Sequence, residues 1–250
     1  MNLYLAGEHT IKNTLAITEI GGGHTILESF YYIRNNQWFP QILPFFDGFL
    51  LDSGAFTYMQ GNGAKCDWDK YIEDYADWIN RFDIKLFFEL DIDSIVGLPR
   101  VEQLRERLEA LTGKKPIPVW HGNRGLDYFK WMCDAYPYVA LGGIAIKEIK
   151  HQDYHKIFPW FITEAHNRGV KIHGLGYTNI EGLHTYHFDS VDSTAWLYGN
   201  RGGYVMIFDE NTGYFIKKQA PEGYRLKSTQ AAIFNNKQWQ KLQAYAVKYL

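Results

Sequence analysis

Two patterns of apolar and polar residues alternate along the chain. Short apolar runs rich in β-branched and aromatic residues are typical of strands, and apolar residues three and four apart predict amphipathic helices. The expected strands are 3–7, 48–56, 85–93, 116–122, 138–146, 171–178, 187–196 and 204–209. The expected helices are 25–34, 67–82, 100–112, 126–136, 154–168 and 228–249.

This alternation predicts an α/β fold in one domain, residues 1–250. Eight strands with interleaved helices in a chain of this length favour a (β/α)8 TIM barrel, and a doubly wound open sheet is the alternative. The links from the sixth to the seventh strand and from the seventh to the eighth are short for helices. Around 210–226 the sequence predicts a small hairpin or irregular insertion.

Composition narrows the functional classes. Apolar residues make up 46% of the chain and charged residues 22%, which is typical of a soluble globular protein. No apolar run is long enough to span a membrane, and the first residues lack the features of a signal peptide. We therefore expect a cytoplasmic protein (in the host cytoplasm if virus-encoded) with no membrane partner. A net charge of −2 means that any nucleic-acid binding needs a local basic patch.

The two cysteines are too few for a disulfide framework and do not form a paired cluster typical of structural zinc. The sequence therefore predicts no metal and no cofactor.

Polar residues collect at the ends of the expected strands. They are Asp52, Asp91, Asp93, His121, Gly142, Gly143, His173, Asp189 and Asp192. In a barrel of this kind these ends meet at the active-site face. One such aspartate alone is more often a cap or an anchor, but a buried carboxylate is costly without a partner or a role. Several at equivalent positions favour a site. Since side chains alternate along a strand, Asp189 and Asp192 are expected on opposite faces.

Six short motifs at these positions carry a resemblance to a known family. They are "DSGAF" (52–56), "ELDID" (89–93), "VWHG" (119–122), "ALGGIAIKE" (140–148), "HGLG" (173–176) and "DSVDS" (189–193). Their order over residues 48–203 resembles that in the tRNA-guanine transglycosylases. These are TIM-barrel enzymes that exchange guanine in a nucleic acid for a 7-deazaguanine, which would be the small-molecule substrate here.

The resemblance implies roles for the carboxylates. Asp192 would be the nucleophile that forms a covalent glycosyl-aspartate, and Asp52 the general acid and base. Asp91 would accept two hydrogen bonds from N1–H and the 2-amino group of guanine. Asp189 would be a supporting carboxylate behind the site. By analogy with retaining glycosidases, we expect the carboxyl groups of Asp52 and Asp192 roughly 5–6 Å apart.

The same resemblance implies a purine pocket. Phe56 would stack on the base, and Gly142, Gly143 and Ile144 would offer backbone groups. His121 stands where the family has a glutamine and could donate to guanine O6.

Three further positions keep two interpretations each. His173 replaces a methionine that covers the base in the family, and is otherwise a hydrogen-bonded loop histidine. Asp93 is a pocket residue or a strand-end cap. Glu148 helps to select the deazapurine or is an exposed residue at a helix start.

The chain departs from the family in one respect that bears on whether the nucleic-acid substrate is DNA or tRNA. No cysteine follows Asp192, so the family's zinc site, which helps to hold tRNA, is missing. A branch that modifies DNA in bacterial viruses and genomic islands is more similar, so DNA is the preferred polymer and tRNA remains possible. A guanine in duplex DNA would have to be flipped out of the stack. Phosphate contacts could come from the basic residues Arg201, Lys217, Lys218 and Arg225, each otherwise a solvated surface charge. The family also tends to form homodimers.

Two alternative functions use the same sequence features. A small-molecule barrel enzyme acting on nucleosides or glycosides needs the same two carboxylates but no basic surface. A non-catalytic partner subunit would not need its nucleophile, whereas this chain keeps carboxylates at both key positions.

Overall fold

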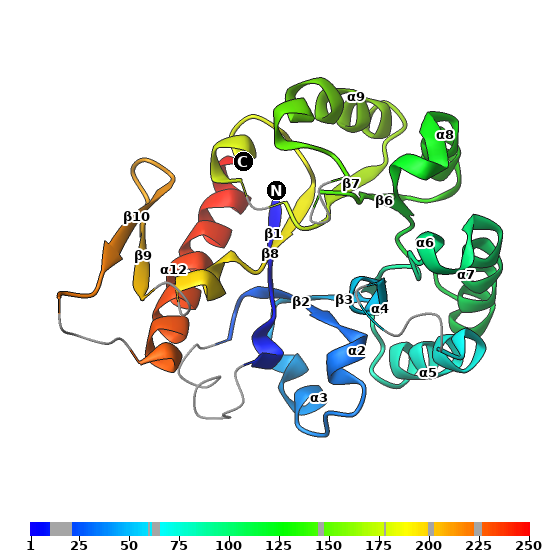
Figure 1. Ribbon diagram of the computed structural model, residues 1–250, viewed down its shortest axis with the longest axis horizontal. Coiled ribbons are helices and arrows are strands. Elements are labelled where there is room, and N and C mark those ends of the chain that lie inside the picture. The colour runs from blue at the N-terminus through cyan, green and yellow to red at the C-terminus, as the bar shows by residue number, and fades with distance from the viewer. Residues whose placement is uncertain are drawn as a thin grey trace.

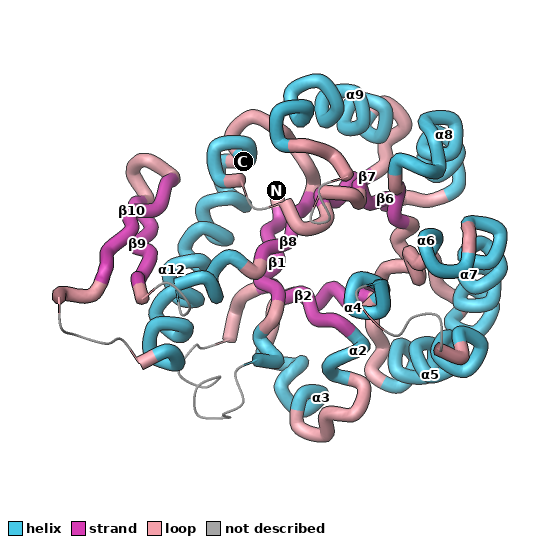
Figure 2. The backbone as a smooth tube through the Cα atoms, viewed as in Figure 1, coloured by secondary structure: helices cyan, strands magenta, loops and turns pink. Residues whose placement is uncertain are grey.

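The computed structural model describes residues 1–10, 22–59, 61, 66–144, 148–177, 179–199, 203–222 and 227–250. Within these residues, eight parallel strands form one sheet in the order β4-β3-β2-β1-β8-β7-β6-β5. The strands are β1 (Asn2–Ala6), β2 (Thr25–Ser29), β3 (Gly48–Asp52), β4 (Leu86–Phe87), β5 (Val119–Trp120), β6 (Tyr138–Leu141), β7 (Lys171–Gly174) and β8 (Ser190–Ser193). The sheet is curved and the helices lie around its outside (Figures 1 and 2).

In the described part of the chain, five long helices cover the outer face. They are α5 (Trp68–Arg81), α7 (Leu98–Thr112), α8 (Gly125–Ala135), α9 (Tyr154–His166) and α12 (Ser228–Tyr249). Shorter helical segments are α2 (Phe30–Ile33), α3 (Phe39–Ile42), α4 (Ala55–Met59), α6 (Asp93–Val96) and α10 (Ile180–Leu183). Helix α5 illustrates why they form, since the side chain of Asp67 accepts the N–H of Lys70 at 3.1 Å and caps its first turn.

The sheet buries both faces, as a parallel sheet must. Alternate residues of each strand point to opposite sides, so that Leu3 and Leu5 of β1 pack in the large cluster beneath the helices. Tyr4 and Ala6 pack in a smaller cluster on the concave side. That cluster is completed by Leu27, Leu50, Phe88, Ile117, Val119 and Ala140.

One isolated bridge lies between the residues next to β4 and β5, the two strands at the ends of the strand order. Phe88, just after β4, forms a parallel bridge with Ile117, just before β5. The N–H of Ile117 donates to the carbonyl of Phe87 at 2.8 Å, and the N–H of Glu89 donates to the carbonyl of Ile117 at 3.1 Å. A doubly wound sheet would place β4 next to β1, but here β1 lies between β2 and β8.

The predicted α/β class with parallel strands is confirmed, but two of the predicted elements are wrong: an expected helix is a strand, and an expected strand of the large sheet lies in another sheet. Residues 25–34, expected to be a helix, form strand β2 followed by α2. The apolar residues Ile26, Phe30 and Ile33 have helical spacing, which predicts a helix. Glu28 also argues against a buried strand in the sequence, because a carboxylate is unexpected there. Conversely, 204–209 is not in the large sheet.

A two-stranded antiparallel hairpin contains that last segment. Strand β9 (Tyr204–Asp209) pairs with β10 (Tyr214–Gln219) beside α12. The predicted hairpin near 210–226 is thus present in part, beginning earlier than expected, and residues 223–226 lie outside the described residues. In the described part of the chain, no helix has the length and apolar character needed to cross a membrane.

Candidate functional site

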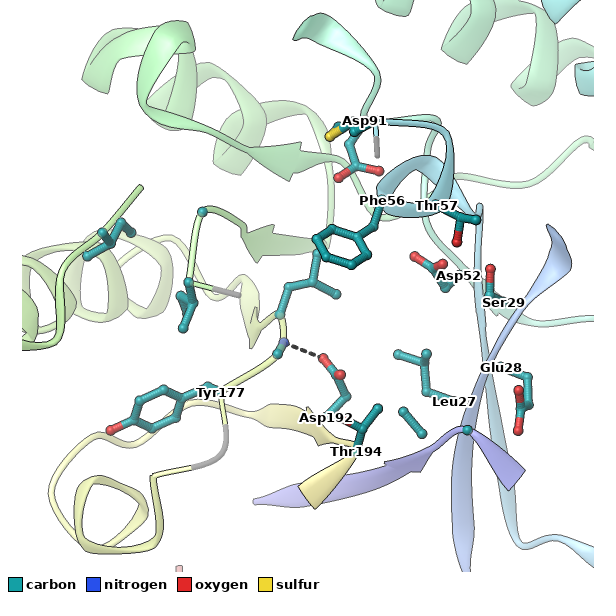
Figure 3. Close-up of a pocket in the computed structure, with 18 of the residues that line it drawn as sticks. Leu27, Glu28, Ser29, Asp52, Phe56, Thr57, Asp91, Tyr177, Asp192 and Thr194 are labelled. Atoms are coloured by element: carbon teal, nitrogen blue, oxygen red, sulfur yellow. Dashed lines mark hydrogen bonds between the residues drawn. The ribbon is translucent and has the colours of Figure 1, made fainter. Parts of the chain in front are cut away.

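A cavity of about 900 Å³ opens at the carboxyl ends of the strands. Asp52 at the end of β3, Asp91 after β4 and Asp192 on β8 all line it (Figure 3). Its volume lies in the range of small-molecule sites. Further predicted residues in its lining are Phe56, His121, Gly143 and Ile144.

Two hydrogen-bonding contacts of the Asp192 side chain are made through the same one of its two carboxylate oxygens. Its Oδ1 accepts the backbone N–H of Gly176 at 2.6 Å, and the Nε2 of His173 lies 3.1 Å from the same oxygen. Figure 3 marks one hydrogen bond of Asp192 with a dashed line. The residue is only 7% exposed and still lines the cavity. Both contacts therefore fix the orientation of the carboxylate without engaging Oδ2.

Asp52 has the electrostatic setting of a proton-transfer group. Burial raises its pKa to about 7, and the negative charges of Asp91 and Asp192 add to the shift. The N–H of Gly54, which donates to Asp52 Oδ2 at 2.9 Å, and the hydroxyl of Ser29 oppose it. A carboxyl group with a pKa near neutrality can both donate and accept a proton at physiological pH.

Asp91 belongs to a chain of three side chains. Its Oδ2 lies 3.1 Å from Nε2 of His121, and Nδ1 of His121 lies 3.4 Å from Oε2 of Glu148. The other oxygen of Glu148 accepts the N–H of Gly122 at 2.6 Å. Burial lowers the pKa of His121, but the hydrogen bond and charge of Asp91 outweigh it, so the net pKa is raised. His121 therefore orients Asp91 and offsets its charge.

The two adjacent glycines make room for this chain. A Cβ on Gly142 would lie 2.7 Å from Cε1 of His121, and a Cβ on Gly143 would lie 2.9 Å from Oε2 of Glu148. Gly143 also has φ of +80°, which disfavours other residues. Gly143 and Ile144 line the cavity, whereas Gly142 acts behind it by letting His121 approach.

Asp93, His173 and Asp189 lie outside the cavity lining. Asp93 forms a buried two-point ion pair with Arg124, at 2.9 and 2.6 Å, so it anchors the start of α6. His173 is fully buried behind Asp192. Asp189 accepts the N–H of Ile172 at 2.8 Å and lies 3.0 Å from Nε2 of His166, on the helix side of the sheet.

Two of the four predicted basic residues lie within the described part of the chain. Arg201 and Arg225 lie outside the described residues. Lys217 and Lys218 are exposed on β10, and Nζ of Lys217 lies 4.1 Å from the ring centre of Tyr204.

A histidine–glutamate pair at the cavity was missed by the sequence reasoning. The N–H of His9 donates to Glu28 at 2.8 Å, and its Nδ1 lies 2.5 Å from the second carboxylate oxygen. The ring of His9 stacks on Tyr32 at 4.5 Å, and all three residues line the cavity. Burial raises the pKa of Glu28 against the opposing effect of His9. The sequence signal for this pair was the carboxylate of Glu28 within 25–29. It indicates a site residue only if that segment is recognised as a buried strand.

Within the described ranges, no group of histidine, cysteine, aspartate and glutamate side chains is arranged to hold a metal ion. Comparison with protein-family models, curated proteins and solved structures gives no match.

Proposed function

We propose that the protein is a base-exchange transglycosylase that replaces guanine in a nucleic acid, preferentially DNA, with a 7-deazaguanine. The observation that carries this proposal is the meeting of Asp52, Asp91 and Asp192 in one cavity, with the pKa of Asp52 near 7. The motif order supports the same assignment. We take the sheet to be a (β/α)8 barrel whose ends meet at the bridge between Phe88 and Ile117.

In the first half-reaction, Oδ2 of Asp192 attacks C1′ of the target nucleotide. The bond from C1′ to N9 of guanine breaks, and protonated Asp52 gives its proton to the departing base. In the second half-reaction, ionised Asp52 takes the N9 proton of the incoming 7-deazaguanine. The new C1′–N9 bond forms as the bond to Asp192 breaks, which restores both carboxyl groups.

Recognition of the base rests on Asp91. A carboxylate can accept two parallel hydrogen bonds from N1–H and the 2-amino group of guanine, a donor pair that the other bases lack. His121 has a carboxylate at each ring nitrogen. Its role in this proposal is therefore to orient Asp91 rather than to bind O6, and Phe56 supplies the stacking face.

The cavity is larger than one base requires, which leaves room for a nucleotide still joined to its polymer. Lys217 and Lys218 are the described residues that we assign to the phosphate backbone. Access to a paired guanine requires base flipping, so single-stranded DNA is the simplest substrate. Such an enzyme acts in the cytoplasm, on DNA within the cell.

A gel-resolved covalent complex tests this proposal. The protein is incubated with guanine-containing DNA and RNA oligonucleotides in parallel, and release of labelled guanine is followed when a 7-deazaguanine is added. We expect an adduct and guanine release with DNA, both lost in Asp192→Ala. An adduct with the RNA oligonucleotide alone would reassign the polymer, and turnover of free nucleosides as fast as DNA would favour a small-molecule enzyme. Full activity of Asp192→Ala would exclude Asp192 as the nucleophile.

A further inference from the structure

A buried chain of side chains runs from Asp192 through the inside of the sheet. His173 on β7 is fully buried, with Nε2 at 3.1 Å from Asp192 Oδ1 and Nδ1 at 2.5 Å from the hydroxyl of Ser190. The hydroxyl of Tyr138 on β6 contacts the same Ser190 oxygen. His173 and Ser190 are register partners between β7 and β8, so the backbone pairing sets this geometry.

The direction of each hydrogen bond follows from its acceptor. An ionised carboxylate only accepts, so Nε2 of His173 must carry a proton. The rings of Phe88 and Tyr4 lie 5.2 and 6.2 Å from its ring. We take the tautomer that carries its proton on Nε2 alone, which leaves Nδ1 as an acceptor for the hydroxyl of Ser190. In that tautomer Nδ1 accepts the proton of Ser190, whose oxygen then accepts from Tyr138. Burial raises the pKa of Tyr138, which keeps it a donor.

We propose that His173 is a positioning residue for the nucleophile, held in its Nε2–H tautomer by Ser190 and Tyr138. Together with the N–H of Gly176, it fixes Oδ1 of Asp192 and leaves Oδ2 to attack C1′. The resemblance gave this position to a residue that covers the base, but the structure places His173 behind the carboxylate. This inference rests on the proposed base exchange.

The arrangement has a consequence for the second half-reaction. When the C1′–Oδ2 bond breaks, its electron pair returns to Asp192, which changes from an ester to a carboxylate. Hydrogen bonds to an ionised acceptor are stronger than those to an ester carbonyl. His173 and Gly176 therefore favour release of Asp192 from the sugar. Loss of the His173 donor is expected to slow this release roughly tenfold.

The experiment separates discharge of the adduct from its formation. The covalent complex is first isolated on a guanine-containing oligonucleotide, and its decay after addition of a 7-deazaguanine is timed. We expect His173→Leu to discharge about tenfold more slowly than the wild type and to accumulate adduct at steady state. His173→Gln, which keeps a donor, should recover much of the rate, and Ser190→Ala should be slowed. His166→Leu, on an exposed histidine outside the cavity, serves as control.

Two outcomes overturn the inference while leaving the proposed function intact. In one, the wild-type protein forms the adduct, and His173→Leu forms and discharges it at the same rates as the wild type. The other is a nitrogen NMR spectrum of the wild-type protein in which His173 is doubly protonated or carries its proton on Nδ1. The NMR readout needs no activity and no variant. Absence of an adduct in the wild type with any polymer would instead overturn the proposed function, and this inference with it.

Discussion

Oε1 of Glu89 accepts the backbone N–H of Val119 at 2.7 Å. The neighbouring bonds between Phe87, Glu89 and Ile117 follow a regular parallel ladder, whose next acceptor for Val119 would be the Glu89 carbonyl. The side chain of Glu89 takes that place. It also receives Nη1 of Arg124 at 2.6 Å and Nη1 of Arg105 at 2.9 Å. A buried carboxylate from the residues after β4 thus bonds to the backbone of β5 at a place where backbone pairing is limited to one bridge.

Glu89→Gln should destabilise the protein strongly. The amide oxygen can still accept from Val119, but two buried guanidinium groups lose their shared counter-charge. Removing one member of a buried ion pair typically costs about 3–5 kcal/mol. We expect a loss of at least about 3 kcal/mol in the free energy of unfolding, measured by urea denaturation.

The matched control is Glu73→Gln, which makes the same chemical change in an exposed pair. Glu73 is 48% exposed and pairs with Arg107. A loss below about 1 kcal/mol is expected there. Equal losses for the two variants would show that the Glu89 cluster does not stabilise the sheet.

The sequence predicted some elements of the fold well and others poorly. Long helices such as 67–82 and 228–249 were found within a residue or two because their apolar spacing is regular. Strand β2 was misread because pairing of Glu28 with His9, which makes its burial tolerable, is a tertiary contact. Residues 204–209 have the apolar pattern of a strand, but the pattern does not tell which sheet the strand joins.

The pH dependence of the two half-reactions should have opposite signs around pH 7. Burial raises the pKa of Asp52 to about 7, so it is protonated below that pH and ionised above it. Adduct formation needs the acid and should fall about tenfold per pH unit above 7, whereas discharge needs the base and should fall below 7. Single-turnover rates between pH 5 and about 9 measure both. Two profiles of the same sign would exclude Asp52 from one of the steps.

Asp52 should also lower stability at alkaline pH. Its pKa is raised from 3.8 to about 7 on folding, so the native state binds more protons in that interval. Its contribution is therefore fully present below pH 3.8 and lost as pH rises through about 7. Asp52→Asn should be more stable than the wild type at about pH 8, with the difference vanishing towards about pH 4, in urea denaturation series.

Asp83→Asn provides the control of opposite sign. Hydrogen bonds from Lys85 and Lys114 lower the pKa of Asp83, so its contribution is present at high pH and lost on acidification. A wild-type protein more stable than Asp52→Asn at pH 8 would contradict the raised pKa of Asp52.

The candidate site was more predictable from the sequence than the strand set. The sequence grouped Asp52, Asp91 and Asp192 with other strand-end residues because the ends of parallel strands meet at one edge of a sheet, and the resemblance to the transglycosylases then singled out these three. The sequence could not show that Asp93 turns away to pair with Arg124, or that His173 lies behind Asp192. These differences depend on which charged partner lies within reach, and that partner is distant in the chain.

Asp91→Asn should change the base that is recognised. An asparagine presents one acceptor and one donor, so it cannot accept from both N1–H and the 2-amino group of guanine. It can instead pair with the N1–H and C2 carbonyl of xanthine. We expect guanine exchange to fall about 10- to 100-fold and the preference to shift towards xanthine, measured on matched oligonucleotides. Asp93→Asn, in the Arg124 ion pair, should keep the guanine preference. An unchanged preference in Asp91→Asn would remove Asp91 from base recognition.

Phe56→Ala should weaken binding of the base through lost stacking. Phe56 is 46% exposed and lines the cavity, so its ring is accessible to a base bound there. Stacking of one base on an aromatic ring is worth about 1–3 kcal/mol. We expect oligonucleotide affinity to fall about 5- to 100-fold with little change in stability. Phe45→Ala, at a ring that is 63% exposed and outside the cavity lining, should bind normally.

The salt dependence of binding should reveal whether the β9–β10 hairpin contacts phosphates. Each lysine that displaces a counterion from single-stranded DNA contributes about 0.7 to the slope of log affinity against log salt. The double variant Lys217→Ala, Lys218→Ala should therefore flatten the slope by about 1.4, whereas Lys130→Ala, on α8, should not change it. Both lysines are exposed and consecutive on β10, so their side chains point to opposite faces of the hairpin. Apart from the contact of Lys217 with Tyr204, their loss should leave folding intact. A slope equal to that of the wild type would mean that the hairpin is not part of the nucleic-acid surface, and the polymer would have to approach the cavity from another side.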